Sequence, residues 1–221
     1  GIFNKKVLNN FIKRLKKNGS KFSYRKVQNK SKKVYEANIT VFNALKKTDY
    51  DSKGKFFLER YVSAHSIMIS FEGIPAIYFN SLFGKSNDEA KYIITGNNRD
   101  VNRYKWNYKN ISKKLSNKNS KQSIFFQKIS NLLNVRRKQK AFHPNASRHN
   151  INLGSNFFSF KRVSIDKGQT IICVTNLSSK IQKTQLNKAY YSWNNLIGSK
   201  IEIRNKLLIL KPFETIWLSN K

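Results

Sequence analysis

The feature that most limits how this chain can fold is the apolar segment at residues 55–71, KFFLERYVSAHSIMISF. Its apolar side chains cover most of a helical circumference, so we expect a helix that is buried on more than one side. Gly73 and Pro75 follow and end that helix, and residues 74–79 are predicted to form a short buried strand. A strand directly behind a buried helix is typical of an α/β unit, in which helices cover a parallel sheet.

The rest of the first 145 residues is predicted to be mostly helix and loop. Apolar residues recur at helical spacing in residues 4–17, which end at Asn18-Gly19, and again in residues 120–139. The later helix is expected to bury four side chains: Phe125, Ile129, Leu132 and Leu133. Residues 80–119 are polar and poorly patterned, which predicts a long loop of the kind that is usually functional or disordered.

The pattern between residues 20 and 54 is weaker. Lys21–Lys26 is a candidate short strand, and the runs QNKSKK (28–33) and TDYDSKG (48–54) indicate loops. The run VYEANITVFNAL (34–45) mixes β-branched and aromatic residues with good helix formers. Its pattern does not decide between strand and helix.

From about residue 150 onward the chain consists of short strand-like runs: NFFSFKRV, TIICVTNL, SKIEIRN and LLILKPFETIWLS. Turn signals at residues 166–168 and 197–199 separate them, which predicts a small all-β domain. The earlier part offers one confident strand, too few to close a parallel sheet. Residue 1 is Gly and the single methionine is Met68, so we expect a piece of a longer protein.

Charge is the most extreme compositional feature. Lysine and arginine number 44 against 11 acidic residues, which gives a net charge of +33. Such an excess keeps a nucleic-acid-binding protein among the alternatives. However, the basic residues are spread along the whole chain and accompany Asn and Ile, and no interleaved aromatic and basic pattern typical of nucleic-acid binding occurs. We therefore expect a distributed charge and no nucleic-acid partner.

Motifs for metals, nucleotides and membranes are not found in the sequence. The histidines lack metal-ligand spacing, and the lone Cys173 excludes an internal disulfide. His65 lies in the apolar helix and is expected to be a core histidine with a satisfied ring nitrogen. No nucleotide-binding glycine loop, G-x-S-x-G elbow, signal peptide or apolar run of about 18 residues occurs. A single cysteine suits a reducing compartment, so we expect a cytoplasmic protein with no membrane partner.

The densest polar motif is TGNNRDVNRYKW, in the loop after the predicted strand. Arg99 and Arg103 are four residues apart, so a helical turn would place both guanidinium groups on one face. Two convergent arginines suit a phosphate or a carboxylate. The alternative is a salt bridge with Asp100 on a solvated face.

Three motifs in order, GIPAIYFNSLFGKSNDEA, TGNNRDVNRYKW and NVRRKQKAFHPNA, resemble the C-terminal part of sucrose-phosphorylase-like enzymes of glycoside hydrolase family 13. The earlier SYR and VYEANITVFNAL resemble that subfamily's acceptor-side insert. The resemblance implies that residues 1–145 are the end of a (β/α)8 TIM barrel, with the insert at about residues 20–50. Residues 146–221 would be the family's C-terminal β-sandwich.

The resemblance also implies a reaction. A retaining double displacement would form a covalent glucosyl-enzyme, and inorganic phosphate would then release glucose 1-phosphate, with no metal or organic cofactor. The family's catalytic carboxylates would precede residue 1. No catalytic residue is therefore assigned among the eleven acids, and this segment alone is expected to lack activity.

The resemblance implies five binding residues. Tyr35, Glu36 and Asn38 match insert positions that face the acceptor, and Arg99 and Arg103 match the two arginines of the later loop. Glu36 stands where typical sucrose phosphorylases have glutamine, whereas relatives that act on glucosylglycerate or phosphorylated sucrose can carry glutamate. The alternatives are that Tyr35 only packs against its neighbours and that Asn38 only caps a turn. A hydrolase or transglucosidase of the same family is the alternative activity, and the acceptor and oligomeric state stay open.

Overall fold

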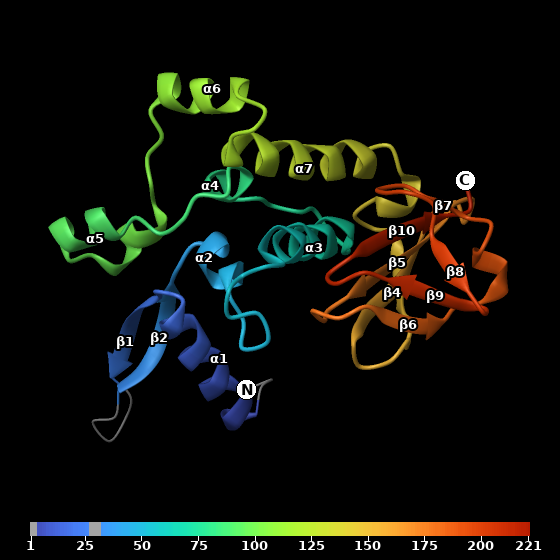
Figure 1. Ribbon diagram of the computed structural model, residues 1–221, viewed down its shortest axis with the longest axis horizontal. Coiled ribbons are helices and arrows are strands. Elements are labelled where there is room, and N and C mark those ends of the chain that lie inside the picture. The colour runs from blue at the N-terminus through green and yellow to red at the C-terminus, as the bar shows by residue number, and fades with distance from the viewer. Residues whose placement is uncertain (1–3, 27–31) are drawn as a thin grey trace. The chain divides into compact units, whose positions relative to one another are not determined.

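The computed structural model describes residues 4–26 and 32–221 of the chain (Figure 1). The chain divides into two compact units, one of Gly1–Gly54 with Ile77–Phe126 and the other of Lys55–Ala76 with Gln127–Lys221. The domain boundary expected at residue 145 stays a prediction. No helix in the described ranges is long and apolar enough to cross a membrane.

The first unit begins with helix α1, Lys5–Lys17, as its periodicity predicts. The Asn4 side chain accepts a hydrogen bond from the Lys6 amide and starts the helix. The chain leaves it through Gly19, whose φ of 90° is easily reached only by glycine. Of its apolar residues Leu15 is buried, whereas Val7, Leu8 and Phe11 are exposed.

The undecided run VYEANITVFNAL contains both kinds of element. Strand β2, Lys32–Asn38, pairs with β1, Lys21–Lys26, in an antiparallel hairpin, and helix α2, Val41–Lys46, follows. The Thr40 hydroxyl accepts a hydrogen bond from the Asn43 amide and starts α2. The prediction for β1 is confirmed. The loop expected at 28–33 is wrong for Lys32 and Lys33, which pair with Lys26 and Arg25, and its other residues lie outside the described ranges.

Residues 80–119 are not the long loop that their composition predicts. They contain helices α4 (Phe79–Leu82), α5 (Glu89–Thr95) and α6 (Tyr108–Ser116) and the 3₁₀ helix η1 (Asn98–Asn102). A polar side chain starts each of the last three, namely Asp88, Asn107 and Asn97. The elements are too short for a clear apolar period, which is why the pattern is not visible in the sequence. The helix predicted at 120–139 is α7, Lys121–Arg136.

The strand predicted at residues 74–79 is wrong. Residues 74–78 have no strand pairing, and Phe79 begins α4. Ile74 is 83% exposed, so the segment is not buried either. A parallel strand needs neighbouring strands for its hydrogen bonds. Every pair of strands in the described chain is antiparallel, and those residues form no barrel.

The second unit contains helix α3, Phe57–Ser70, at the predicted apolar segment. Its buried residues lie on more than one side, as predicted: Arg60, Tyr61, Ser63, His65, Ser66, Ile69 and Ser70. The His65 Nδ1–H donates a 2.8 Å hydrogen bond to the Tyr61 carbonyl. The prediction of a core histidine with a satisfied ring nitrogen is confirmed.

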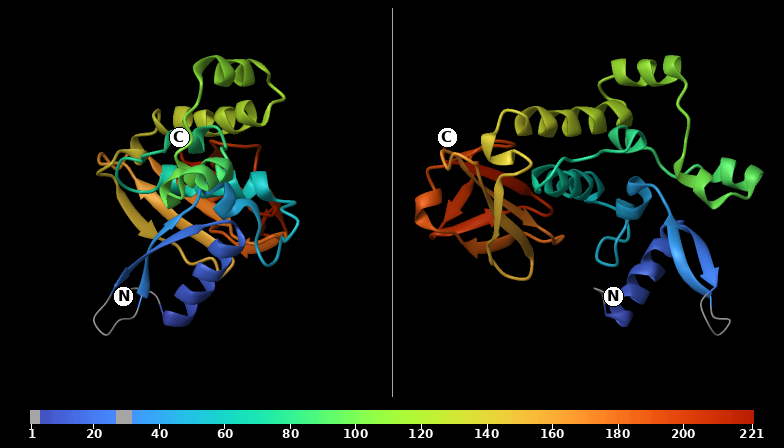
Figure 2. Two further views of the ribbon diagram at one scale, coloured as in Figure 1. Left: turned by 90° about the vertical axis from the view of Figure 1, so that its left-hand side faces the viewer. Right: turned by 180° about the vertical axis from the view of Figure 1, so that it is seen from behind.

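The all-β region is two antiparallel sheets, in orders β3-β4-β5-β10-β7 and β6-β9-β8. Their strands stay together in one body in every view of Figures 1 and 2. The bounds are β3 Ser147–Asn150, β4 Phe157–Val163, β5 Thr170–Asn176, β6 Gln182–Gln185, β7 Asn194–Asn195, β8 Glu202–Arg204, β9 Leu207–Leu210 and β10 Thr215–Ser219. Two 3₁₀ helices, η2 (Lys140–Phe142) and η3 (Lys188–Tyr190), lie in the same unit.

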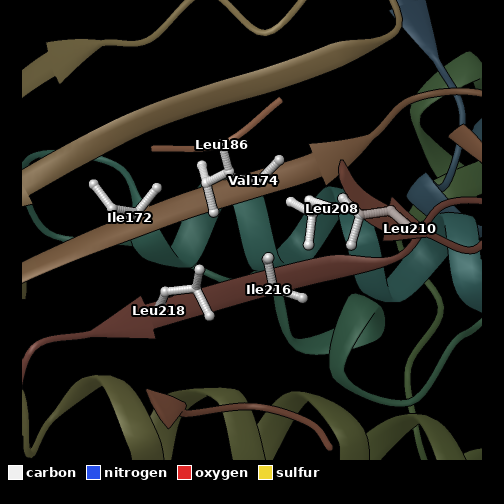
Figure 3. Close-up of a cluster of buried hydrophobic side chains, with 7 residues drawn as sticks. All are labelled: Ile172, Val174, Leu186, Leu208, Leu210, Ile216 and Leu218. Carbon is white, nitrogen blue, oxygen red and sulfur yellow. The ribbon is translucent and has the colours of Figure 1, made fainter. Parts of the chain in front are cut away.

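The apolar core of this region lies between the two sheets (Figure 3). Both sheets contribute to it, through Ile172, Val174, Leu208, Leu210, Ile216 and Leu218, and Leu186, which directly follows β6, also belongs to it. A core shared by the inner faces of two antiparallel sheets defines a β-sandwich. The sandwich predicted for the C-terminal region is confirmed.

Candidate functional site

A β-bulge in the β1–β2 hairpin sets the direction of Tyr35. Ser23 faces Glu36 and Tyr24 faces Val34, so Tyr35 is an extra residue on β2. A bulge bends its strand and redirects the side chain it carries, and bulges are frequent next to active sites. Tyr35 is 64% exposed, and the Arg25 guanidinium lies 6.0 Å from its ring centre. Tyr35 therefore presents most of its ring to solvent rather than to a core.

Glu36 forms an ion pair with Arg99. The Arg99 Nε donates to the Glu36 Oε2 at 3.1 Å, across 63 residues of sequence. The preceding residue, Asn98, donates from its Nδ2 to the Phe22 carbonyl at 3.0 Å and lies 3.3 Å from the Ser23 hydroxyl. Helix η1 is thus attached to both strands of the hairpin. The structure brings Glu36 and Arg99, two of the predicted site residues, into direct contact.

The two arginines do not share an α-helical turn. Arg99 lies inside η1, a 3₁₀ helix, and Arg103 is the residue that ends it. With three residues per turn, positions four apart point in different directions. Arg99 is paired with Glu36, whereas Arg103 is exposed and makes no side-chain hydrogen bond or ion pair with any described residue.

Asp100 is not the ion-pair partner of either arginine. The Lys91 ammonium lies 3.2 Å from its Oδ1. A hydrogen bond from the Thr95 side chain, followed by the Lys91 contact and the charges of Lys91 and Arg103, holds the pKa of Asp100 below its ordinary value. The alternative of a salt bridge between Asp100 and these arginines is therefore wrong as a direct contact.

Asn38, at the end of β2, is 2% exposed. Its carbonyl accepts a 3.3 Å hydrogen bond from the Ser20 hydroxyl. Its side-chain Nδ2 is buried and has no hydrogen-bond partner among the described residues. Such an unsatisfied donor is costly, by about 1–3 kcal/mol. Because Thr40 starts α2, Asn38 is not the cap of that helix.

Two asparagines that hold this region were not among the predicted site residues. Asn87 Oδ1 accepts hydrogen bonds at 3.0 Å from the Thr40 amide and hydroxyl, and its Nδ2 donates to the Gly19 carbonyl at 3.0 Å. Asn98 attaches η1 to β1, as described above. Both lie within the motifs that carry the family resemblance, but Asn is frequent throughout this chain and its spacing gives no further signal.

The acidic residues of the described chain mostly have cationic partners. Ion pairs join Arg14 to Asp49, Lys21 to Glu89, Lys140 to Asp166, Arg148 to Glu72 and Arg204 to Glu202, in addition to the two pairs above. No three His, Cys, Asp or Glu side chains of the described residues gather as a metal site would require. These pairings give no reason to assign an acid a catalytic role.

The fold matches the C-terminal part of a longer protein of known crystal structure. The crystal structure of sucrose 6F-phosphate phosphorylase from Thermoanaerobacter thermosaccharolyticum matches 80% of this chain and 33% of that protein. The TM-score is 0.64 and the sequence identity is 20%, so this match shows the fold alone. The expected fold class, a mixed α/β region followed by a β domain, is confirmed, without a barrel in the described residues.

The sequence is similar to that of phosphorylases. Glucosylglycerate phosphorylase of Escherichia coli (strain K12) is 26% identical over 218 residues, which cover 99% of this chain and 38% of that protein. Its counterpart in Spirochaeta thermophila is 28% identical over 178 residues, 80% of this chain and 30% of that one. No family model matches the chain. The resemblance to the sucrose-phosphorylase-like subfamily of glycoside hydrolase family 13 is confirmed, and the chain spans well under half the length of these relatives.

Proposed function

We propose that the chain forms the acceptor-side part of a retaining glucoside phosphorylase. The reaction transfers a glucosyl unit from glucosylglycerate, sucrose or a related glucoside to inorganic phosphate. The observation that carries this proposal is the match to glucosylglycerate phosphorylase over 99% of the chain. A cytoplasmic location belongs to the same proposal and rests on the single cysteine, which suits a reducing compartment.

In this proposal the chain contributes binding groups rather than the reacting carboxylates. A nucleophilic and an acid/base carboxyl group would come from the rest of the enzyme and form and resolve a glucosyl-enzyme. Arg103 is exposed and without an ion-pair partner among the described residues, so it can donate two parallel hydrogen bonds to a phosphate or carboxylate. The bulged Tyr35 offers a ring and a hydroxyl to the acceptor, and Asn38 a buried donor.

A hydrolase or transglucosidase of the same family is the second candidate. Those reactions use water or a sugar as the acceptor and need no anion site. An exposed arginine without a partner favours phosphate as the acceptor, although it does not by itself fix the donor glucoside. The nucleic-acid alternative receives no support from the relatives, which are sugar phosphorylases.

The test is to purify the complete product of the gene that encodes this chain and supply it with glucosylglycerate or sucrose. We expect glucose 1-phosphate to form only when inorganic phosphate is present. Glucose release at the same rate with and without phosphate would establish the hydrolase instead. A folded gene product that consumes neither glucoside would overturn the proposal.

A further inference from the structure

One rung of the β1–β2 hairpin is held from both sides by two consecutive residues of η1. Ser23 and Glu36 face each other across the rung. Asn98 binds the β1 side through the Ser23 hydroxyl, at 3.3 Å, and through the carbonyl of the preceding residue, Phe22. Arg99 binds the β2 side through the Glu36 carboxylate. The bulge that carries Tyr35 begins at this same rung. The contact from η1 therefore acts where the hairpin changes its register.

The hairpin has little else to fix it at its far end. Two-stranded ribbons are marginally stable alone, and like charges directly opposite each other destabilise a pair of strands. The last two rungs place Arg25 opposite Lys33 and Lys26 opposite Lys32. At the near end, Lys21 pairs with Glu89 at 2.9 Å. Among the described residues, the contact with η1 is thus the attachment of the hairpin that lies next to Tyr35.

The ion pair also changes the charge that the site presents. Glu36 is opposed by Arg99, and Asp100 is opposed by Lys91, so each of these two pairs is close to neutral. Arg103 is the remaining charge of η1 and the residue that follows it, and no described residue forms an ion pair with it. If Arg99 were absent, the Glu36 carboxylate would stand on β2 beside Tyr35 as an uncompensated negative charge.

We propose that Arg99 is a positioning residue that acts through Glu36. It docks the bulged hairpin on η1, and by neutralising Glu36 it allows a negatively charged acceptor to approach Tyr35 and Arg103. This inference rests on the proposed function for its acceptor, but the docking itself does not. It assigns the anion-binding role to Arg103 alone, instead of to a pair of convergent arginines.

The docking is tested by hydrogen–deuterium exchange of the backbone amides in the complete gene product. We expect Arg99→Met to speed exchange in β1 and β2 by about two- to fivefold, as for loss of a partly exposed ion pair, and to leave β4 and β5 unchanged. The double charge reversal Glu36→Arg with Arg99→Glu should restore protection. Arg148→Met is the matched control, since it removes an Nε to Oε2 pair of 3.2 Å in the other unit. Unchanged exchange in β1 and β2 of the Arg99→Met protein would overturn the positioning role.

The charge effect is tested with two acceptors that differ in one carboxylate, glycerate and glycerol, in the direction of synthesis from glucose 1-phosphate. We expect Arg99→Met to raise the KM for glycerate at least about threefold more than that for glycerol, because the uncovered Glu36 carboxylate repels the anion. The double variant Glu36→Gln with Arg99→Met should restore the ratio of the two KM values. If Arg99 had a purely structural role, Arg99→Met would change the KM values for glycerate and glycerol by the same factor.

The two measurements separate the possible failures. A protein that makes no glucose 1-phosphate, but whose hairpin loosens in Arg99→Met, refutes the proposed function and retains the docking. If the protein is an active phosphorylase and Arg99→Met raises the KM values for both acceptors by the same factor, the neutralisation of Glu36 by Arg99 is refuted.

Discussion

The Nη1 atom of Arg162 lies 3.0 Å from the carbonyl oxygen of Ser70, although 92 residues separate them. Arg162 is on β4 and fully buried, and Ser70 is the last residue of α3. The last carbonyls of a helix have no partner within it, and cations near them are favourable. Arg136 of α7 donates to the carbonyls of Ile69, Phe71 and Gly73 in the same place. Two arginines thus donate hydrogen bonds to the carbonyl groups at the C-terminal end of α3.

The first prediction follows from this pair. Arg162 also donates to the carbonyls of His143 and Ala146, at 2.8 and 3.2 Å. Arg162→Met therefore removes the Arg162 hydrogen bond from two buried acceptors, the Ser70 and Ala146 carbonyls, and from the His143 carbonyl, which keeps the Ala146 amide at 3.0 Å. We expect a loss of about 3–5 kcal/mol in the free energy of unfolding, measured by urea denaturation. Arg162→Lys should recover part of it, because lysine lacks the planar fork. Arg148→Met, on the neighbouring strand, is the control; an equal loss there would argue against this role.

How far the sequence predicts the fold depends on where each element finds its partners. Residues 55–71 and 120–139 carry a long apolar period, and β4, β5 and β10 carry runs of aromatic or β-branched residues, so their own sequence identifies them. Residues 74–79 have the composition of a strand, but strand formation depends on neighbouring strands that the described chain does not provide. The helices α5, η1 and α6, between residues 89 and 116, are each started by a single polar side chain. Such side chains are too common in this chain to identify a helix start.

The candidate site shows the same division. Tyr35, Glu36, Asn38, Arg99 and Arg103 can be named from their motifs, but the bulge at Tyr35 is a matter of register between β1 and β2. The contact between Glu36 and Arg99 joins residues 63 positions apart, and neither side chain indicates it alone. The 3₁₀ geometry that separates Arg99 from Arg103 is likewise set by local capping at Asn97, whose side chain accepts from the Arg99 amide.

The second prediction concerns the pH dependence of stability. Burial holds the pKa of His65 below its ordinary value, which is about 6.5 in the unfolded chain. The unfolded state therefore binds more protons below that pH, and stability is lost progressively as the pH falls from about 6.5 toward the lower pKa of the folded state. We expect His65→Gln to reduce the difference in unfolding free energy between pH 7.5 and pH 5.5. His149→Gln, which removes an exposed histidine, is the control; if both variants behave alike, His65 is not the group responsible.

The third prediction concerns the thiol. Cys173 is buried on β5, and burial raises the pKa of its thiol to about 12. The thiolate is the reactive form, so the native protein should react with iodoacetamide at pH 8 at least about a hundredfold more slowly than the urea-unfolded protein. The measurement is the rate of alkylation followed by mass spectrometry. Rapid modification of the native protein would show that the sandwich opens around β5 far more often than its packing indicates.

The last prediction concerns Arg103 in the complete gene product, and it depends on the proposed function. Arg103 follows η1, is exposed, and has no ion-pair partner among the described residues, so its guanidinium is available to an anion. Arg103→Ala should slow phosphorolysis about a hundredfold, as expected for loss of one preorganised charged donor. Hydrolysis of the same glucoside should fall less, since water needs no anion site. Arg103→Lys should recover only part of the rate, because a point charge replaces a bidentate donor.

The measurement for Arg103 is a pair of rates on one glucoside, with and without phosphate. Arg204→Ala is the matched control, since it removes an exposed arginine on β8, in the other unit, and the same unit of charge. That variant should leave both rates unchanged, which separates a local effect at η1 from a general effect of net charge. If Arg103→Ala lowered phosphorolysis and hydrolysis by one common factor, Arg103 would be shaping the loop or the glucosyl subsite. Its assignment as the anion-binding residue would then be wrong.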